Sequence, residues 1–145
     1  MVFWARDLES GPELIACSYD GVNWSLGPEY CWCSLSRNGS DSSNDIFYNP
    51  FTKLWCIICR KRNCARRVAM ADSVNFKHWT EPRLILHPDV MDPPLLQFYG
   101  MPVVSYEKEY FIGIVQCLHF RAEEFKSRGK MDGAVDGQLV YSYDG

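Results

Sequence analysis

The sequence lacks the features that mark a membrane protein, a secreted protein or a nucleic-acid-binding protein. No apolar run among its 145 residues is long enough to span a bilayer. The N-terminus has no basic region followed by an apolar core, so we expect no secretory signal and a cytoplasmic protein. Neither sign of charge dominates, because 15 Lys and Arg face 18 Asp and Glu, and a net charge of −3 offers no general attraction for nucleic acid.

Disulfide pairing and metal ligation are also poorly supported by the seven cysteines. An odd number of cysteines without a secretory signal favours free thiols. Cys56 and Cys59 form the densest group, with further cysteines nearby in the sequence. Residues 55–60 read as a buried strand, however, in which these two thiols point to opposite faces, whereas a zinc knuckle holds both on one turn. We therefore expect small buried thiols, no metal and no cofactor.

What the sequence does contain is a short phrase that occurs three times. A strand runs into a serine, a turn follows, and a tryptophan stands six residues after the serine. The copies begin at Ser18, Ser73 and Ser142, and the third copy comprises residues 142–145. Self-similarity at a spacing of about fifty to seventy residues is typical of stacked repeats. With 14% aromatic residues and almost no helical periodicity, the phrase predicts an all-β propeller.

The strands between these phrases fall into repeated units. Residues 37–90 read as one complete four-stranded blade, residues 91–145 as most of the next, and residues 1–36 as the end of the preceding one. An aromatic pair followed by proline opens both later units, and we interpret it as a second repeat on the strands that line the central channel. The two pairs are Phe47 with Tyr48 and Phe98 with Tyr99.

The number of units raises the question of closure. A closed propeller typically has four to eight blades, and this chain supplies about two to three. We therefore expect a fragment of a longer protein, or a chain that another chain completes. Blade surfaces left uncovered would be apolar, so self-association through them is expected.

Several stretches carry a family resemblance. Residues 41–60 read Asp-x-x-Asn-x-x-Phe-Tyr-Asn-Pro-Phe-x-x-x-Trp-x-x-x-x-Arg, and an arginine pair and the phrase at residues 73–79 follow. A later stretch, Gln97-Phe-Tyr-Gly-Met, agrees. Together they resemble the five-bladed propeller glycoside hydrolases, nearest to glycosidase-like proteins related to families 43 and 32, from about Ala16 onward. The resemblance implies a fragment of a five-bladed β-propeller that hydrolyses glycosidic bonds.

Hydrolysis of a glycosidic bond needs two carboxyl groups, one as acid and one as base or nucleophile. The resemblance implies that these acids lie on the innermost strands or on the loops that enter them. Asp41 and Asp45 precede the first aromatic pair, and either is expected to be the base or nucleophile. Asp92 precedes the second pair and is expected to orient sugar hydroxyls or to tune another carboxyl. The proton donor of the resembled enzymes lies on a further blade.

Six residues are candidates for sugar contacts. The resemblance matches two arginines, whose guanidinium groups can bind hydroxyls or a uronate carboxylate, although a solvated basic hairpin is about equally expected. Two tyrosines could stack on a sugar ring, yet aromatic residues in sheets more often lie in the core. A glutamine belongs to the resembled stretch, and a histidine ends a strand beside a polar loop. The six are Arg60, Arg67, Tyr48, Tyr99, Gln97 and His119.

Two rival interpretations stay open. A propeller that binds carbohydrate or protein without catalysis fits the same pattern, because a fold does not establish a function. A sialidase-type propeller uses a similar serine turn. Its turn, however, has one more residue between aspartate and glycine than Ser18 to Gly21 shows, and it lacks the Phe-Tyr-Asn-Pro strand. The glycosidase therefore ranks first, the binding module second and the sialidase third.

Overall fold

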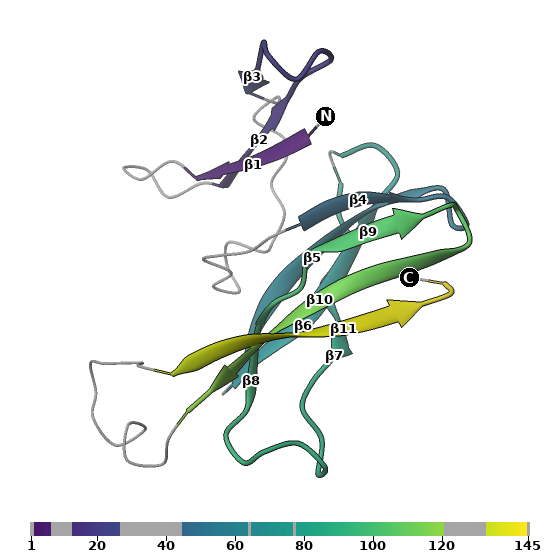
Figure 1. Cartoon of the computed structure of the whole chain (residues 1–145). Coiled ribbons are helices and arrows are strands. Elements are labelled where there is room, and N and C mark those ends of the chain that lie inside the picture. Colours follow the sequence, from purple (N-terminus) through teal and green to yellow (C-terminus); the bar gives the residue numbers. More distant parts are fainter. Residues whose placement is uncertain are drawn as a thin grey trace.

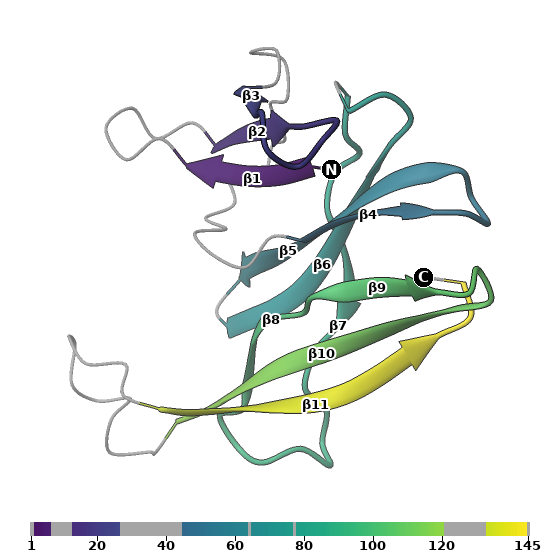
Figure 2. The same cartoon turned by 45° about the horizontal axis from the view of Figure 1, so that its top comes forward.

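The structure is a computed structural model that describes residues 2–6, 13–26, 45–63, 65–76, 78–120 and 133–144. These ranges form strands and their connections and contain no helix, hence no helix long and apolar enough to cross a membrane. The strands build three antiparallel sheets, which follow one another in chain order from top to bottom of Figure 2. The chain is thus all-β, and its sheets form part of a β-propeller-like fold (Figure 1).

The first sheet is the smallest. It consists of β1 (Val2–Arg6), β2 (Glu13–Cys17) and β3 (Ser25–Leu26), with β2 in the middle. The connection from β2 to β3 is the first copy of the serine phrase. The tryptophan of that copy is Trp24, immediately before β3.

The second sheet is a complete four-stranded antiparallel sheet, as the sequence predicts. Its strands are β4 (Asp45–Asn49), β5 (Leu54–Asn63), β6 (Ala65–Ser73) and β7 (Arg83–Leu86), paired in this order. Asn49 closes the first hairpin, because its side-chain oxygen accepts hydrogen bonds from the backbone N–H groups of Phe51 and Thr52 at 2.9 and 3.1 Å.

The third sheet contains β8 (Gln97–Gly100), β9 (Val103–Tyr106), β10 (Tyr110–His119) and β11 (Ala134–Ser142). Both β8 and β9 pair with the same edge of β10, so together they form one interrupted inner strand. The interruption falls at Met101 and Pro102, where proline removes a backbone donor. The register with β10 shifts within β8 instead, between the pairs Gly100–Gln116 and Phe98–Cys117. Within the described residues, β11 pairs with β10 alone.

The second and third sheets share a strand register. The serine of the phrase ends the third long strand in each, and it lies opposite Trp55 in one sheet and opposite Phe111 in the other. Every position on β5 and β6 therefore has an equivalent on β10 and β11. Ile57 is equivalent to Gly113, for example, and Ala71 is equivalent to Val140.

This register corrects the interpretation of the two aromatic pairs. Both lie on the first strands of their sheets, but they are not equivalent positions. Phe47 lies opposite Cys56, whose equivalent in the third sheet is Ile112, whereas Phe98 lies opposite Cys117, further along β10. The inner strand of the third sheet is longer and is interrupted by a proline, so equal spacing in the sequence does not give equal positions in the sheets.

The serine turns after β2, β6 and β11 share one hydrogen-bond pattern. In each, the serine hydroxyl donates to a side-chain oxygen two residues on, at 3.0 Å in the first turn, 3.5 Å in the second and 2.7 Å in the third. Where the tryptophan is described, its indole N–H donates to the backbone carbonyl three residues before it; the pairs are Trp24 with Gly21 and Trp79 with Phe76. The residue three positions after the serine has positive φ in these two turns, 77° at Gly21 and 62° at Phe76.

The main apolar core lies between the second and third sheets. Phe47, Ile58 and Met70 of the second sheet pack there against Phe111 and other residues of the third. A smaller cluster covers the opposite face of the second sheet; it contains Ile57, Cys59, Ala69 and Ala71, with Ile46 and Trp79 packed against it. Each face of the second sheet thus has its own apolar layer.

The cysteine prediction is confirmed where the structure tests it. Cys56 belongs to the main core and Cys59 to the smaller cluster, so the two side chains lie on opposite faces of β5. Both are buried free thiols, as is Cys117. The remaining cysteines lie where the structure does not describe side chains.

Candidate functional site

Polar side chains gather where the inter-sheet core ends, at the start of β6 and β8. The carbonyl oxygen of the Gln97 side chain accepts hydrogen bonds from the backbone N–H and from Nη1 of Arg66, at 3.2 and 2.9 Å. The guanidinium carbons of Arg60 and Arg66 lie 5.0 and 5.7 Å from the centroid of the Tyr99 ring, and Arg66 also lies 5.9 Å from the ring of Phe120. We call these five residues the arginine–tyrosine cluster.

Strand alternation places this cluster. Side chains two residues apart on a strand share a face. Arg60 therefore follows Ile58 on the face of β5 that packs against the third sheet, and Arg66 precedes Val68 and Met70 on the corresponding face of β6. The apolar core covers the middle of this face, and the arginines extend it at one end.

Burial divides the cluster into two layers. Arg60 is 3% exposed and Gln97 6% exposed, so neither offers much surface to a ligand. Tyr99, Arg66 and Phe120 are partly exposed. The accessible part is thus an aromatic ring beside a guanidinium group, and the buried members hold that ring and that guanidinium in place.

Asp45 connects the second and third sheets. It is the first residue of β4 and lies opposite Ile58, one step along the same face from Arg60. Its Oδ2 accepts a hydrogen bond from the backbone N–H of Val103 at 2.6 Å. Removal of the half-buried carboxyl from water raises the pKa of Asp45, although the backbone hydrogen bonds of Val103 and Ile46 oppose this shift.

Asp92 lies in the connection between β7 and β8. Its carboxylate accepts a hydrogen bond from the backbone N–H of Asp89 at 2.8 Å, and its own N–H donates to the carbonyl of Asp89 at 3.3 Å. Its charge acts on Cys117, whose pKa is raised mainly by burial and further by Asp136 and Asp92. Asp45, in contrast, is bonded to Val103, which lies opposite Gly113 on β10. The recorded contacts of the two carboxyls therefore fall on different parts of that strand, and Asp41 lies outside the described residues.

The other predicted contact residues lie apart from the cluster. Tyr48 is 43% exposed on the opposite face of the second sheet from Phe47, and its ring meets that of Trp55 edge-on at 5.1 Å. Arg67 alternates with Arg66 and so belongs to that same opposite face. His119 ends β10, and its Nε2 lies 3.1 Å from Oδ2 of Asp136 at an exposed position. The structure thus brings together Arg60, Gln97 and Tyr99 of the six predicted contacts.

Two members of the cluster were not predicted from the sequence, Arg66 and Phe120. The choice between Arg66 and Arg67 was available from alternation, because Arg66 shares a face with the apolar residues Val68 and Met70. Phe120 follows directly after β10, and no signal in the sequence links it to an arginine on β6.

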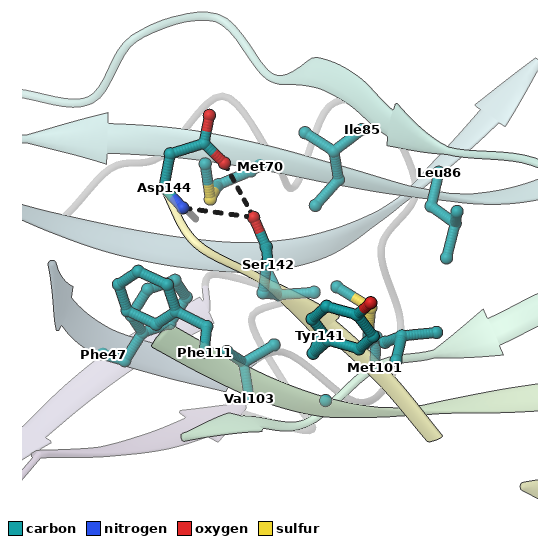
Figure 3. A pocket seen from close by; sticks show the side chains of 13 residues that line it. Phe47, Met70, Ile85, Leu86, Met101, Val103, Phe111, Tyr141, Ser142 and Asp144 are labelled. Atoms are coloured by element: carbon teal, nitrogen blue, oxygen red, sulfur yellow. Dashed lines mark hydrogen bonds between the residues drawn. The ribbon is translucent and has the colours of Figure 1, made fainter. Parts of the chain in front are cut away.

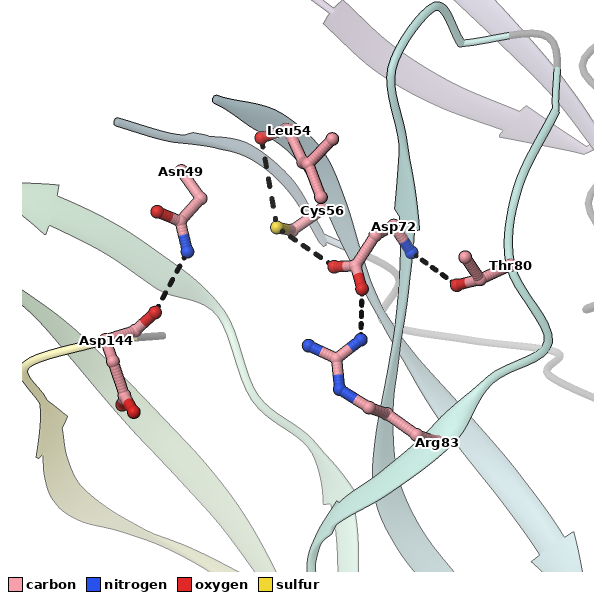
Figure 4. Close-up of polar contacts among 7 residues, drawn as sticks. All are labelled: Asn49, Leu54, Cys56, Asp72, Thr80, Arg83 and Asp144. Atoms are coloured by element: carbon pink, nitrogen blue, oxygen red, sulfur yellow. Dashed lines mark hydrogen bonds and ion pairs between the residues drawn. The ribbon is translucent and has the colours of Figure 1, made fainter. Parts of the chain in front are cut away.

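A second polar group lies further along the face of β5 and β6 that carries Arg60 and Arg66 (Figure 4). Asp72 accepts a hydrogen bond from the thiol of Cys56 at 3.4 Å and forms an ion pair with Arg83. Burial, followed by the effect of Asp72, raises the pKa of Cys56 to about 12, so the thiol stays protonated at neutral pH. The side-chain amide of Asn49 donates to the backbone carbonyl of Asp144 at 3.0 Å, which joins the second sheet to the third serine turn. These contacts are structural.

No group of three or more His, Cys, Asp or Glu side chains suited to a metal ion occurs in the part of the chain that the structure describes.

No protein-family model and no curated protein sequence matches the chain. The chain is similar in structure to the N-acetylgalactosamine deacetylase from F. plautii in complex with blood group B trisaccharide, with a TM-score of 0.60 and 20% sequence identity. The match covers 91% of this chain and 41% of that chain, so the present chain spans less than half of the enzyme it resembles. At this identity the similarity concerns the fold.

Proposed function

We propose that this chain forms part of a carbohydrate-binding β-propeller and that the arginine–tyrosine cluster contacts the sugar. The observation that carries the proposal is the partly exposed Tyr99 ring, which lies against two guanidinium groups. An aromatic face packs against the C–H groups of a sugar ring, and a guanidinium group donates paired hydrogen bonds to hydroxyls or to a carboxylate. The similar structure contains a protein that acts on N-acetylgalactosamine and binds a trisaccharide, which supports the same ligand class.

The members of the cluster have different roles in this proposal. Tyr99, Arg66 and Phe120 touch the ligand because they retain exposed surface. Arg60 and Gln97 are positioning residues, since one lies buried against the ring and the other fixes Arg66 through two hydrogen bonds. Asp45, near Arg60 on the same face, provides a carboxyl at the edge of this site.

A tyrosine pair on the same interrupted inner strand provides the test. Tyr99→Ala removes the proposed stacking face, and Tyr106→Ala removes a tyrosine that is exposed at the other end of that strand. The protein is titrated by NMR with neutral, N-acetylated and uronate-containing oligosaccharides. We expect Tyr99→Ala to weaken binding about 10-fold, equivalent to about 1.4 kcal/mol, and Tyr106→Ala to leave it unchanged. Equal losses in both variants, or no binding to any of the sugars, would contradict the proposal.

Hydrolysis by carboxylate chemistry is the second candidate function, and the raised pKa of Asp45 favours it. A raised pKa makes the ionised carboxylate a stronger general base, and glycosidases tune the pKa values of their carboxyl groups in this way. In that proposal the chain belongs to the five-bladed glycoside hydrolases, with Asp41 or Asp45 as base or nucleophile and Asp92 as the second acid. Turnover that disappears in Asp45→Asn while sugar binding persists would support hydrolysis. Binding without turnover of any sugar would favour the binding module.

A further inference from the structure

An apolar pocket of about 370 Å³ lies between the second and third sheets, beside the third serine turn (Figure 3). From the second sheet it is lined by Met70, Ile85 and Leu86 among others, and from the third by Phe111, Gly113 and Val140. Ser142 and Asp144 of the serine turn also line it. Its volume is at the small end of the range for ligand sites, which suits a single ring system.

The shared register gives this pocket an equivalent elsewhere in the molecule. Phe111, Gly113, Val140 and Ser142 are the third-sheet equivalents of Trp55, Ile57, Ala71 and Ser73. In the second sheet, the cluster that contains Ile57 and Ala71 is covered by the side chain of Trp79. The pocket therefore lies over the same strand positions that Trp79 covers one sheet earlier.

We propose that this pocket binds a tryptophan indole presented by a strand that adds to the outer edge of β11, in the position that Trp79 occupies one sheet earlier. The first two serine turns both lead to such a tryptophan, and each indole donates to a carbonyl of its own turn. The third turn already has the hydrogen bond between Ser142 and Asp144 that the earlier turns share. Ser142 and Asp144 of this turn also line the pocket, so a strand that follows the turn would start beside it (Figure 3).

Two further observations fit an aromatic occupant. Gly113 stands where the second sheet has Ile57, so backbone and not a side chain lines the pocket at this position. A Cβ at this position would lie 3.1 Å from Cγ2 of Val140 and 3.3 Å from Cγ of Met101, so the backbone is closely approached on this side. Within the described residues the outer edge of β11 has no paired strand, whereas β7 pairs with the equivalent edge of β6 after Trp79.

The test adds three residues after Gly145. One protein receives Val-Asn-Trp, which copies the residues at 22–24, and its matched control receives Val-Asn-Ala. We expect the tryptophan tail to raise the Tm by about 5 °C over the alanine tail, because it places an aromatic ring in an apolar pocket. Equal Tm values for the two tails would overturn the proposal.

A double-mutant cycle identifies where the added ring binds. Ile85→Ala removes a pocket side chain, whereas Leu84→Ala removes its exposed neighbour on β7, which does not line the pocket. The gain from the tryptophan tail should fall by at least half in Ile85→Ala and persist in Leu84→Ala. A gain that is insensitive to Ile85→Ala would mean that the ring binds elsewhere. Light scattering measures whether the extended protein dimerises. A Tm gain that appears only with dimer formation would mean that the pocket binds a second copy, and this would overturn the proposal that the ring binds within its own chain.

Discussion

The second and third sheets share a strand register, but their equivalent strands β6 and β11 differ in how far they are buried. On β6, the four residues from Val68 to Ala71 are almost completely buried, whereas β11 is exposed along most of its length, with Leu139 at 75%. β6 has β5 on one edge and β7 on the other and carries apolar layers on both faces. β11 has a partner on one edge only within the described residues. Burial of a strand is therefore a property of its neighbours, while its register is set by the serine turn and the pairing.

The largest test of this difference compares Ile58 with its equivalent Ile114. Ile58 is 1% exposed between the two sheets, whereas Ile114 is 50% exposed on the outer face of the third. Ile58→Ala should lower the free energy of unfolding by about 2 to 5 kcal/mol, because it leaves a cavity in the core. Ile114→Ala should lower it by less than about 1 kcal/mol. Urea denaturation of both variants measures the difference, and equal losses would mean that the third sheet is covered in solution.

A medium effect is expected at Asp45, which connects the two sheets. Its equivalent in the third sheet is Pro102, which has no carboxyl. Because the folded pKa of Asp45 is raised above its usual 3.8, the native state binds this proton more tightly than the unfolded state does. This contribution is fully present at low pH and is lost as pH rises through the folded pKa.

Asp45→Asn removes that dependence and keeps an oxygen that can accept the hydrogen bond from Val103. The free energy of unfolding of the variant minus that of the original protein should therefore rise with pH above about 3.8 and be positive at neutral pH. Urea midpoints of both proteins, measured from pH 3 to pH 7, give this difference. A constant difference across the range would show that Asp45 has the same pKa in the folded and unfolded states.

The smallest effects are expected at one ion pair on each sheet. Asp72 and Arg83 belong to the second sheet, and Asp72 is mostly covered and also bonded to Cys56. Arg83→Gln should destabilise the protein by about 1 kcal/mol. His119 and Asp136 form an exposed pair on the third sheet, so Asp136→Asn should change stability by less than about 0.5 kcal/mol. Thermal unfolding at low and high salt measures both, and a larger loss from Asp136→Asn would reverse the expected ranking.

The sequence predicts much of the fold because its signals are local. Strand alternation placed Cys56 and Cys59 on opposite faces, and the serine phrase marked turns that share one hydrogen-bond pattern. The aromatic pairs misled because pairing across strands is not local. The first strand of the third sheet is interrupted at Met101 and Pro102, and its register with β10 shifts within β8, which sequence spacing alone does not reveal.

The candidate site is harder to predict for the same reason. Arg60, Gln97 and Tyr99 meet only because β8 lies beside β6, two strands from different sheets. Strand alternation is enough to assign Arg66 to the face between the sheets, but the contact of Phe120 with Arg66 depends on how the sheets pack against each other. Asp45 is the clearest case of a contact that the sequence does not reveal, since its hydrogen-bond partner Val103 is 58 residues away in the chain.

Phe76 has a consequence for the order in which the second sheet forms. It holds a left-handed backbone conformation that Gly21 adopts without steric cost in the first turn. Its ring lies 4.4 Å from that of Trp55 and meets Trp79 edge-on, so aromatic contacts offset a local backbone penalty of about 1 kcal/mol or more. The glycine of the first turn needs no such support, whereas the conformation of the second turn depends on a tryptophan from a neighbouring strand. We therefore expect the second turn to form late, after β5 and β6 have paired.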